Sequence, residues 1–143
     1  MIDYSQQIAA YDKHLQALLR STRISLSDAR TKGNISGEPG VYRIFLEDEF
    51  DQSLYIGKTR DLRRRICDDL LSGDEQSHTL RKKLASSYNL PDKAAVTDFL
   101  VRGYQCQILI VPRVTEISCL EHYAIAALRP KLNDERWSES EDE

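Results

Sequence analysis

The sequence has few cysteines and no long apolar run. Its three cysteines, Cys67, Cys106 and Cys119, form no C-x-x-C pair, so a zinc site is not expected. An odd number of cysteines in a cytoplasmic chain indicates reduced thiols. No stretch reaches the roughly 20 apolar residues of a membrane-spanning helix, and residues 1–4 show no signal-peptide pattern. We therefore expect a cytoplasmic protein that does not span a membrane.

Positive charge is also scarce in the chain as a whole. The formal net charge is −3 over 143 residues, whereas nucleic-acid-binding domains are usually basic. Residues 134–143, however, carry six acidic residues and one arginine, and without them the remaining chain has a net charge of +2. Between Lys58 and Lys83 lie eight basic and five acidic residues. The pattern predicts a modest phosphate-binding surface in this segment and an acidic, disordered tail over residues 134–143.

Two short segments predict a β-hairpin that carries two tyrosines. Residues 41–46 and 53–57 are rich in β-branched and aromatic side chains, and a polar loop joins them. We take Leu46 to pair with Ser53 across the loop. In that register, Ile44 lies opposite Tyr55, and Tyr42 lies diagonally beside Tyr55 on the same face. A register slip of one residue would place the two hydroxyls on opposite faces, and the sequence leaves this alternative open.

A glycine and a cluster of arginines follow the second predicted strand. Gly57 offers a bare backbone that a ligand or another segment can approach closely. In the next segment, apolar side chains recur at helical spacing, at Leu62, Ile66 and Leu70. At about 100° per residue, Arg63 and Arg65 fall on the two flanks of this apolar stripe, and Arg64 faces solvent. The spacing therefore leaves Arg63 and Arg65 as two candidates for a functional site.

A glutamate falls on the apolar face of a later predicted helix. Between residues 115 and 128, apolar side chains recur at helical spacing, at Ile117, Leu120, Ala124 and Leu128, and Glu121 falls among them. A carboxylate is costly to bury unless it is paired, hydrogen-bonded or bound to a metal. Glu121 is therefore a candidate metal ligand, and the alternatives are a misphased helix or a buried ion pair with an arginine.

The remaining patterns predict helices and a third strand around the hairpin. A helix begins near His78, a second covers residues 93–101, and a strand covers residues 104–111. We expect a small α/β (α+β) domain with a three-stranded, mostly antiparallel sheet flanked by helices.

The domain organisation follows from these elements. Residues 1–38 hold an extra amphipathic helix and a linker, residues 39–133 form the domain, and residues 134–143 are the acidic tail. Packing onto the domain is the expected role of the N-terminal helix, and a homodimer contact or a substrate clamp are the alternatives.

These elements together resemble the GIY-YIG nuclease superfamily. Members of that family carry a Gly-Ile-Tyr-like strand, a Tyr-Ile-Gly-like strand, an arginine on the next helix, a glutamate on a later helix and a terminal asparagine. Here the corresponding segments are Gly40-Val41-Tyr42, Tyr55-Ile56-Gly57, Arg65, Glu121 and Asn133. The stretch from Tyr55 to Arg65 is especially similar to the nuclease domain of bacterial excision repair, and that similarity selects Arg65 over Arg63.

The resemblance implies a metal-dependent endonuclease that hydrolyses phosphodiester bonds in DNA, in repair or restriction. It implies that Glu121 holds Mg²⁺ or Mn²⁺, which prefer oxygen ligands, and that Arg65 binds phosphate oxygens. It also implies that Tyr42 or Tyr55 activates the attacking water, and which of the two is the base stays open. RNA is an alternative substrate, and a non-catalytic nucleic-acid-binding module is the alternative function.

Further positions of the motif take supporting roles by the same resemblance. Substrate contacts are expected from four polar residues, Lys58, Arg63, His78 and Asn133. Structural roles are expected for Gly40 and Gly57.

Overall fold

The computed structural model describes residues 2–32 and 34–133, so the predicted acidic tail lies outside the described residues. In chain order the elements are α1 (Ser5–Arg20), β1 (Ile24–Ser25), α2 (Leu26–Lys32), β2 (Gly40–Leu46), β3 (Tyr55–Thr59), the π-helix η1 (Arg64–Leu70), α3 (Thr79–Ser87), α4 (Lys93–Val101), β4 (Tyr104–Ile110) and α5 (Val114–Leu128). No helix in the described part of the chain is long and apolar enough to cross a bilayer.

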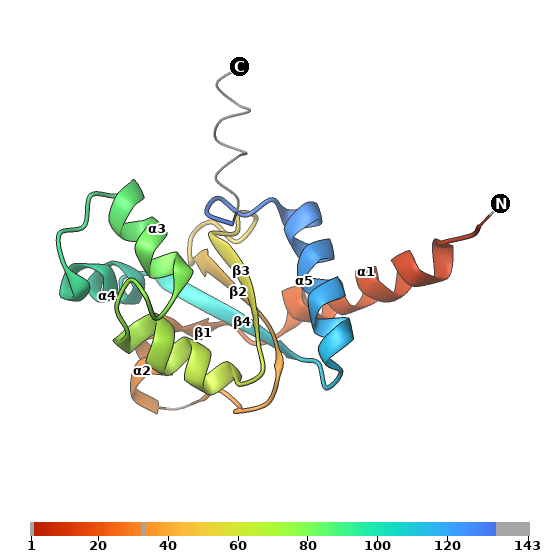
Figure 1. Ribbon diagram of the computed structural model, residues 1–143, viewed down its shortest axis with the longest axis horizontal. Helices are drawn as coiled ribbons and strands as arrows, with labels where there is room; N and C mark the ends of the chain where they lie inside the picture. Colours follow the sequence, from red (N-terminus) through yellow and green to blue (C-terminus); the bar gives the residue numbers. More distant parts are fainter. Residues whose placement is uncertain (1, 33, 134–143) are drawn as a thin grey trace, which may run out of the picture.

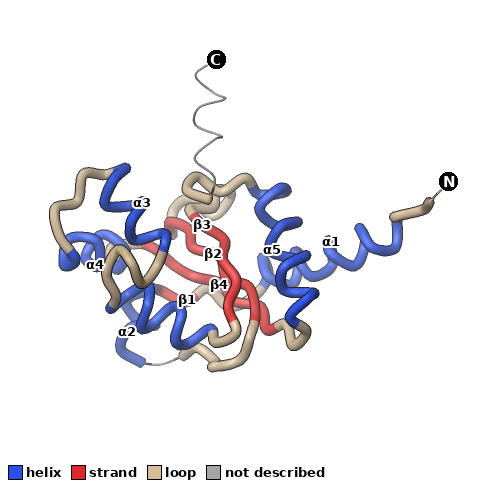
Figure 2. Tube along the Cα trace, in the orientation of Figure 1, coloured by secondary structure: helices blue, strands red, loops and turns tan. Residues whose placement is uncertain are grey.

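The sheet has four antiparallel strands in the order β1-β4-β2-β3 (Figures 1 and 2). The predicted α+β class is confirmed, and the three predicted strands are β2, β3 and β4. The fourth strand, β1, was not predicted. It has only two residues, which pair with Cys106 and Gln105 of β4, and two residues are too few to show an alternating pattern.

The predicted hairpin register is confirmed. Ile44 pairs with Tyr55, and Tyr42 pairs with Gly57. The alternative register is therefore excluded, and both tyrosines extend from the same face of the sheet.

Alternating side chains of β2 enter two separate cores. Tyr42 and Ile44 join a core formed with α2, η1, α3 and α4, whereas Val41 joins a second core formed with α1 and α5. Figure 1 shows these two groups of helices on opposite sides of the sheet. The strand β3 is at the edge of the sheet, so side chains from both layers can approach it.

The N-terminal helix α1 packs against α5 and β4. Its buried residues, Leu15 and Leu18, lie in its C-terminal half, and Tyr11 contacts Tyr123 of α5 with a ring-centroid distance of 5.8 Å. Ile8, in the first turn of the helix, is 54% exposed. The first turns of α1 extend beyond the body of the domain (Figure 1). A dimer contact through α1 stays a prediction.

The segment after β3 is helical as predicted, but its helix type differs from the prediction. Residues Arg64–Leu70 form a π-helix rather than an α-helix, and π-helical turns are rare and frequently found at functional sites. The apolar stripe of Leu62, Ile66 and Leu70 is fully buried. The apolar spacing therefore located the buried face, although it could not distinguish the two helix types.

Gly57 is required by the ring of Tyr42. A Cβ atom at position 57 would overlap the Cζ and hydroxyl oxygen of Tyr42. The group that approaches the bare backbone of Gly57 is therefore the side chain of Tyr42 on the neighbouring strand β2. At Gly40, a Cβ atom would overlap the carbonyl of Leu109 and crowd the side chain of Leu62.

We predict that Gly57→Ala destabilises the fold, because the new methyl group must displace the buried Tyr42 ring. Overpacking of this kind costs about 1–3 kcal/mol. Gly37→Ala is the matched control, since its Cβ would only meet Asp61 Oδ1 at an ordinary 3.6 Å. Urea denaturation of the three proteins measures the difference. Equal unfolding free energies for the two variants would contradict the contact between Tyr42 and Gly57.

Candidate active site

The residues predicted for the site come together around the edge strand β3. Tyr55 extends from β3 itself and Tyr42 from the adjacent β2, with their ring centroids 6.3 Å apart. Arg65 comes from η1 and Glu121 from α5. The charges of both Arg65 and Glu121 influence the pKa of Tyr55, so these three side chains share one electrostatic environment.

Tyr42 and His78 form a buried pair beneath the site. Tyr42 is fully buried and His78 is 1% exposed, and the Tyr42 hydroxyl lies 2.7 Å from Nε2 of His78. The other ring nitrogen, Nδ1, accepts the backbone N–H of Leu80 at 3.0 Å and caps the N-terminus of α3. Both nitrogens of His78 are therefore engaged. The substrate contact expected of His78 would require one of these bonds to break, and it stays a prediction.

Burial governs the ionisation of the two tyrosines. Burial raises the pKa of Tyr42 strongly, Tyr55 raises it further, and the charge of Arg65 acts in the opposite direction. Burial also raises the pKa of Tyr55, Arg65 opposes that shift, and Glu121 adds to it. Tyr55 is partly exposed, so solvent can reach it, whereas Tyr42 is covered.

Arg65 is held by the loop that precedes α3. Its Nη1 donates to the carbonyl of Ser77 at 2.9 Å and to Oδ2 of Asp69 at 3.3 Å. Arg63 turns away and donates from Nε to the carbonyl of Ile35 at 2.8 Å, and Arg64 is exposed. Of the three arginines, Arg65 is the one beside the tyrosines, although a substrate contact by Arg63 stays a prediction.

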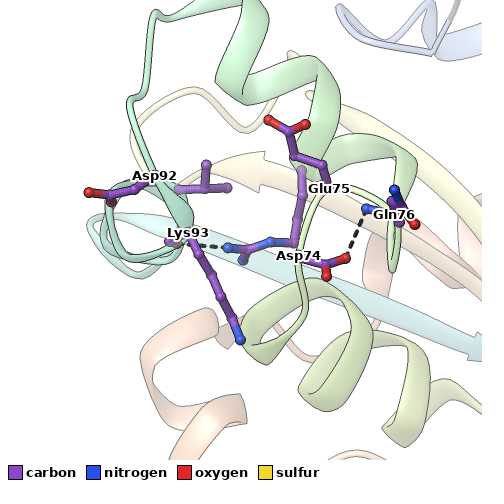
Figure 3. Close-up of a pocket in the computed structure, with 7 residues that line it drawn as sticks. Asp74, Glu75, Gln76, Asp92 and Lys93 are labelled. Atoms are coloured by element: carbon purple, nitrogen blue, oxygen red, sulfur yellow. Dashed lines mark hydrogen bonds between the residues drawn. The ribbon is translucent and has the colours of Figure 1, made fainter.

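The loop that supports Arg65 has its own hydrogen-bond framework. Oδ1 of Asp74 accepts the backbone N–H of Gln76 at 2.9 Å and that of Ser77 at 3.0 Å. Figure 3 shows Asp74 and Gln76 among the residues that line a pocket, which Arg81 and Lys93 also line. This pocket contains none of the predicted site residues. Asp74 in its wall accepts the backbone N–H of Ser77, the residue whose carbonyl accepts a hydrogen bond from Arg65.

Glu121 lies at the rim of the buried face of α5. Its side chain is 15% exposed, and its Oε1 lies 4.0 Å from Nζ of Lys58 and 3.9 Å from Nε2 of His122. Burial raises the pKa of Glu121, and the charges of Lys58 and His122 lower it. Lys58 also donates to Oγ of Ser118 at 3.0 Å. The partner of Glu121 is thus a lysine on β3, not the arginine considered as the alternative from the sequence.

Comparison with known proteins identifies what this arrangement resembles. No family model matches the chain. It is 32% identical over 101 residues to UvrABC system protein C of Haemophilus influenzae, an alignment that covers 70% of this chain. It is 28% identical over 111 residues to the same protein of Xylella fastidiosa, covering 77% of this chain. The chain spans only about 13% of the first of these relatives and 15% of the second.

The solved structures include the GIY-YIG N-terminal endonuclease domain of UvrC from Thermotoga maritima with bound magnesium. Its similarity to this chain has a TM-score of 0.44 at 22% identity, and it covers 75% of this chain and 92% of that domain. The relatives found by sequence and the ordered motif indicate the same kind of domain. This chain carries a GIY-YIG-type domain.

Asn133 of the GIY-YIG domain is committed to the backbone of β3. Its Oδ1 accepts the N–H of Ile56 and its Nδ2 donates to the Ile56 carbonyl, both at 2.7 Å. The backbone N–H groups of Lys131 and Leu132 donate to the carbonyls of Ser53 and Leu54. We call residues 131–133 the edge clamp, because they pair with the outer edge of β3 next to Tyr55.

A residue that sequence reasoning missed secures the edge clamp. Lys83 of α3 donates from Nζ to the carbonyl of Leu132 at 2.8 Å and to that of Asn133 at 3.1 Å. In the sequence, Lys83 was one of several basic residues counted as phosphate-binding charge. Its helical position gave no signal that it binds backbone carbonyls from the end of the domain. A substrate contact by Asn133 stays a prediction, but both its side-chain polar atoms hold β3.

The donor set of the GIY-YIG domain fits a hard cation. Among the described residues, no three His, Cys, Asp or Glu side chains lie close enough to hold a metal together. Glu121 is a single, largely buried carboxylate, and Mg²⁺ is commonly held by one or two carboxylates with waters and phosphate completing its shell. Lys58 would have to yield part of its contact with Glu121 to a cation.

The burial of His78 generates a prediction about pH. Burial, followed by the charges of Arg65 and Arg81, lowers the pKa of His78 to about 3. Below about 6.5, the ordinary pKa of histidine, the unfolded chain binds a proton that native His78 does not. The contribution of His78 should therefore lower the unfolding free energy as the pH falls from about 6.5 toward 3, by about 1.4 kcal/mol per pH unit.

Comparison with His78→Gln isolates this contribution, since glutamine does not titrate. Denaturation at several pH values should give a shallower pH dependence for His78→Gln than for the wild type. His14→Gln, an exposed change on α1, is the control for the change of residue type. Parallel curves for wild type and His78→Gln would contradict a neutral, buried His78.

Proposed function

We propose that the GIY-YIG domain of this chain is a divalent-metal-dependent endonuclease that hydrolyses phosphodiester bonds in DNA. The observation that carries the proposal is the convergence of Glu121, Tyr55 and Arg65 at the edge of β3. These side chains offer a carboxylate, a phenol and a guanidinium within one environment. A binding module has no need of a largely buried carboxylate beside phosphate-binding cations, because that carboxylate repels phosphate.

Each of the three side chains has a distinct part in the proposed hydrolysis. Glu121 holds Mg²⁺ or Mn²⁺, and the bound cation supplies positive charge for the phosphate and a more acidic water. Arg65 stays protonated and donates to phosphate oxygens as negative charge develops on them. Tyr55 is partly exposed, so we assign it the role of orienting and deprotonating the attacking water. Tyr42 is buried below it and has a supporting role.

Exposed cations next to the site suit a polyanionic substrate. Lys58 is 44% exposed and Arg60, Arg63 and Arg64 are exposed on the same stretch between β3 and η1. Phosphate contacts of this kind hold nucleic acid without reading its sequence. DNA is proposed as the substrate on the strength of the similarity to UvrC, and RNA is an outcome of the same test.

Glu121→Gln is the test of the metal-holding role. The amide keeps the size of the side chain but removes its charge, so cleavage of DNA in Mg²⁺ or Mn²⁺ should fall by about 100- to 1,000-fold. Glu116→Gln, on the first turn of the same helix, is the matched control and should cleave like the wild type. Binding of a fluorescent DNA should persist in both variants.

Two results would count against the proposal. Undiminished metal-dependent cleavage by Glu121→Gln would remove Glu121 from the site. A wild-type protein that binds DNA but cleaves neither DNA nor RNA in either metal would favour the non-catalytic binding module.

The exposure difference between the tyrosines predicts unequal effects of removing their hydroxyls. Tyr55→Phe should lower the single-turnover cleavage rate by about 100- to 10,000-fold, the range for loss of a general base. Tyr42→Phe should cost about tenfold, the upper range for a neutral hydrogen bond. Single-turnover rates of both variants, measured at saturating DNA, show which rate loss is larger. A larger loss for Tyr42→Phe would reverse the assignment of the base.

A further inference from the structure

The edge clamp is bonded to both peptide groups that flank Tyr55. The carbonyl of Leu54 belongs to the peptide group before Tyr55, and it accepts the N–H of Leu132 at 3.0 Å. The N–H of Ile56 belongs to the peptide group after Tyr55, and it donates to Oδ1 of Asn133 at 2.7 Å. Only the φ and ψ rotations of Tyr55 are soft between these two groups. By holding both groups, the clamp fixes the direction in which the Tyr55 side chain leaves β3.

Lys83 joins the edge clamp to α3. Its Nζ donates to the carbonyl of Leu132 at 2.8 Å and to that of Asn133 at 3.1 Å, and both hydrogen bonds are partly buried. Hydrogen bonds from an ionised donor are stronger than neutral ones. The helix that carries Lys83 is itself well anchored, because its Leu80 and Leu84 are fully buried. Lys83 therefore holds the clamp from a fixed support.

The surroundings of Lys83 differ from those of its neighbour Lys82. Lys83 is partly buried, and two carbonyls of the edge clamp accept hydrogen bonds from its ammonium group. An ammonium group has three hydrogens to donate, so the clamp takes most of this capacity. Lys82 is exposed to solvent. The two lysines carry the same charge, but the charge of Lys83 is directed at the protein's own backbone.

We propose that Lys83 is a positioning residue whose ammonium group seats the edge clamp on β3, and thereby holds the Tyr55 hydroxyl in place for the attacking water. The proposal deepens the proposed endonuclease function and rests on it. The alternatives are that Lys83 only supplies positive charge for binding DNA, or that it only stabilises the fold.

Two methionine variants separate positioning from phosphate binding. Lys83→Met removes the ammonium group and keeps an unbranched side chain, and Lys82→Met removes the same charge from the exposed neighbour. Lys83→Met should lower the single-turnover cleavage rate at saturating DNA by about 10- to 100-fold, the effect of losing hydrogen bonds to a charged group. Its dissociation constant for DNA should stay close to that of the wild type. Lys82→Met should change the affinity and its salt dependence instead.

The rate at saturating DNA decides between these two roles of Lys83. An undiminished rate for Lys83→Met would overturn the proposal. A loss of affinity in its place, like that of Lys82→Met, would make Lys83 a phosphate contact.

A double-mutant cycle tests whether Lys83 acts through Tyr55. Tyr55→Phe lacks the hydroxyl that is to be positioned, so adding Lys83→Met to it should cost little further rate. A residue that only stabilises the fold would lower the rate equally in both backgrounds. Rate losses that multiply in the double variant would therefore overturn the proposal.

Amide hydrogen exchange reports on the edge clamp without any cleavage of DNA. Lys83→Met should accelerate exchange of the N–H groups of Ile56 and Leu132, which bond across the clamp. The N–H of Leu54 is the internal reference, because it donates to the carbonyl of Ile44 on the inner side of the hairpin at 2.8 Å. Unchanged protection of Ile56 and Leu132 would overturn the proposal even in a protein that cleaves DNA. Faster exchange in a protein whose wild type does not cleave would instead locate the failure in the proposed function.

Discussion

Because β2 and β3 pair in the register that sets Tyr42 opposite Gly57, the Tyr42 ring lies against bare backbone at the edge of the sheet. From there its hydroxyl reaches His78 at the start of α3. A buried hydroxyl left without a partner would cost about 1–3 kcal/mol. The hydrogen bond with His78 removes that cost and also ties α3 to the hairpin. The contact thus determines the arrangement of three separate elements.

The sheet brings together side chains from its two faces. Tyr42 and His78 belong to the layer of α2, η1, α3 and α4, whereas Glu121 extends from α5 in the opposite layer. They meet because β3 is the last strand of the sheet, and the edge clamp lies on its outer side. An exposed strand edge is usually a liability for aggregation. In this domain the edge is partly covered by Asn133, and it also carries the candidate site.

The sequence predicted the fold and the candidate site where the pattern involves residues close together in the chain. The hairpin and the register it favours follow from two short segments and one loop, although only the structure excludes a slip of one residue. Glu121 stood out because one carboxylate interrupts an apolar face. The π-helix, β1 and the partners of His78 were not predictable in the same way. The π-helix shares its apolar spacing with an α-helix, and β1 is too short to alternate. The bonds of His78 and Lys83 join residues that are distant in sequence, and only the tertiary fold brings them together.

The edge clamp has a consequence for the order of folding. Tyr42 and Tyr55 belong to one hairpin with a short loop, so they can meet early, whereas Asn133 and Ile56 are 77 residues apart in the chain. Long-range contacts form late, because the entropy of closing a long loop must be offset by contacts that are already present. The order of closure that this predicts is the hairpin first and the edge clamp last. The outer edge of β3 is complete only when residues 131–133 have docked, so the site is complete only in the native fold.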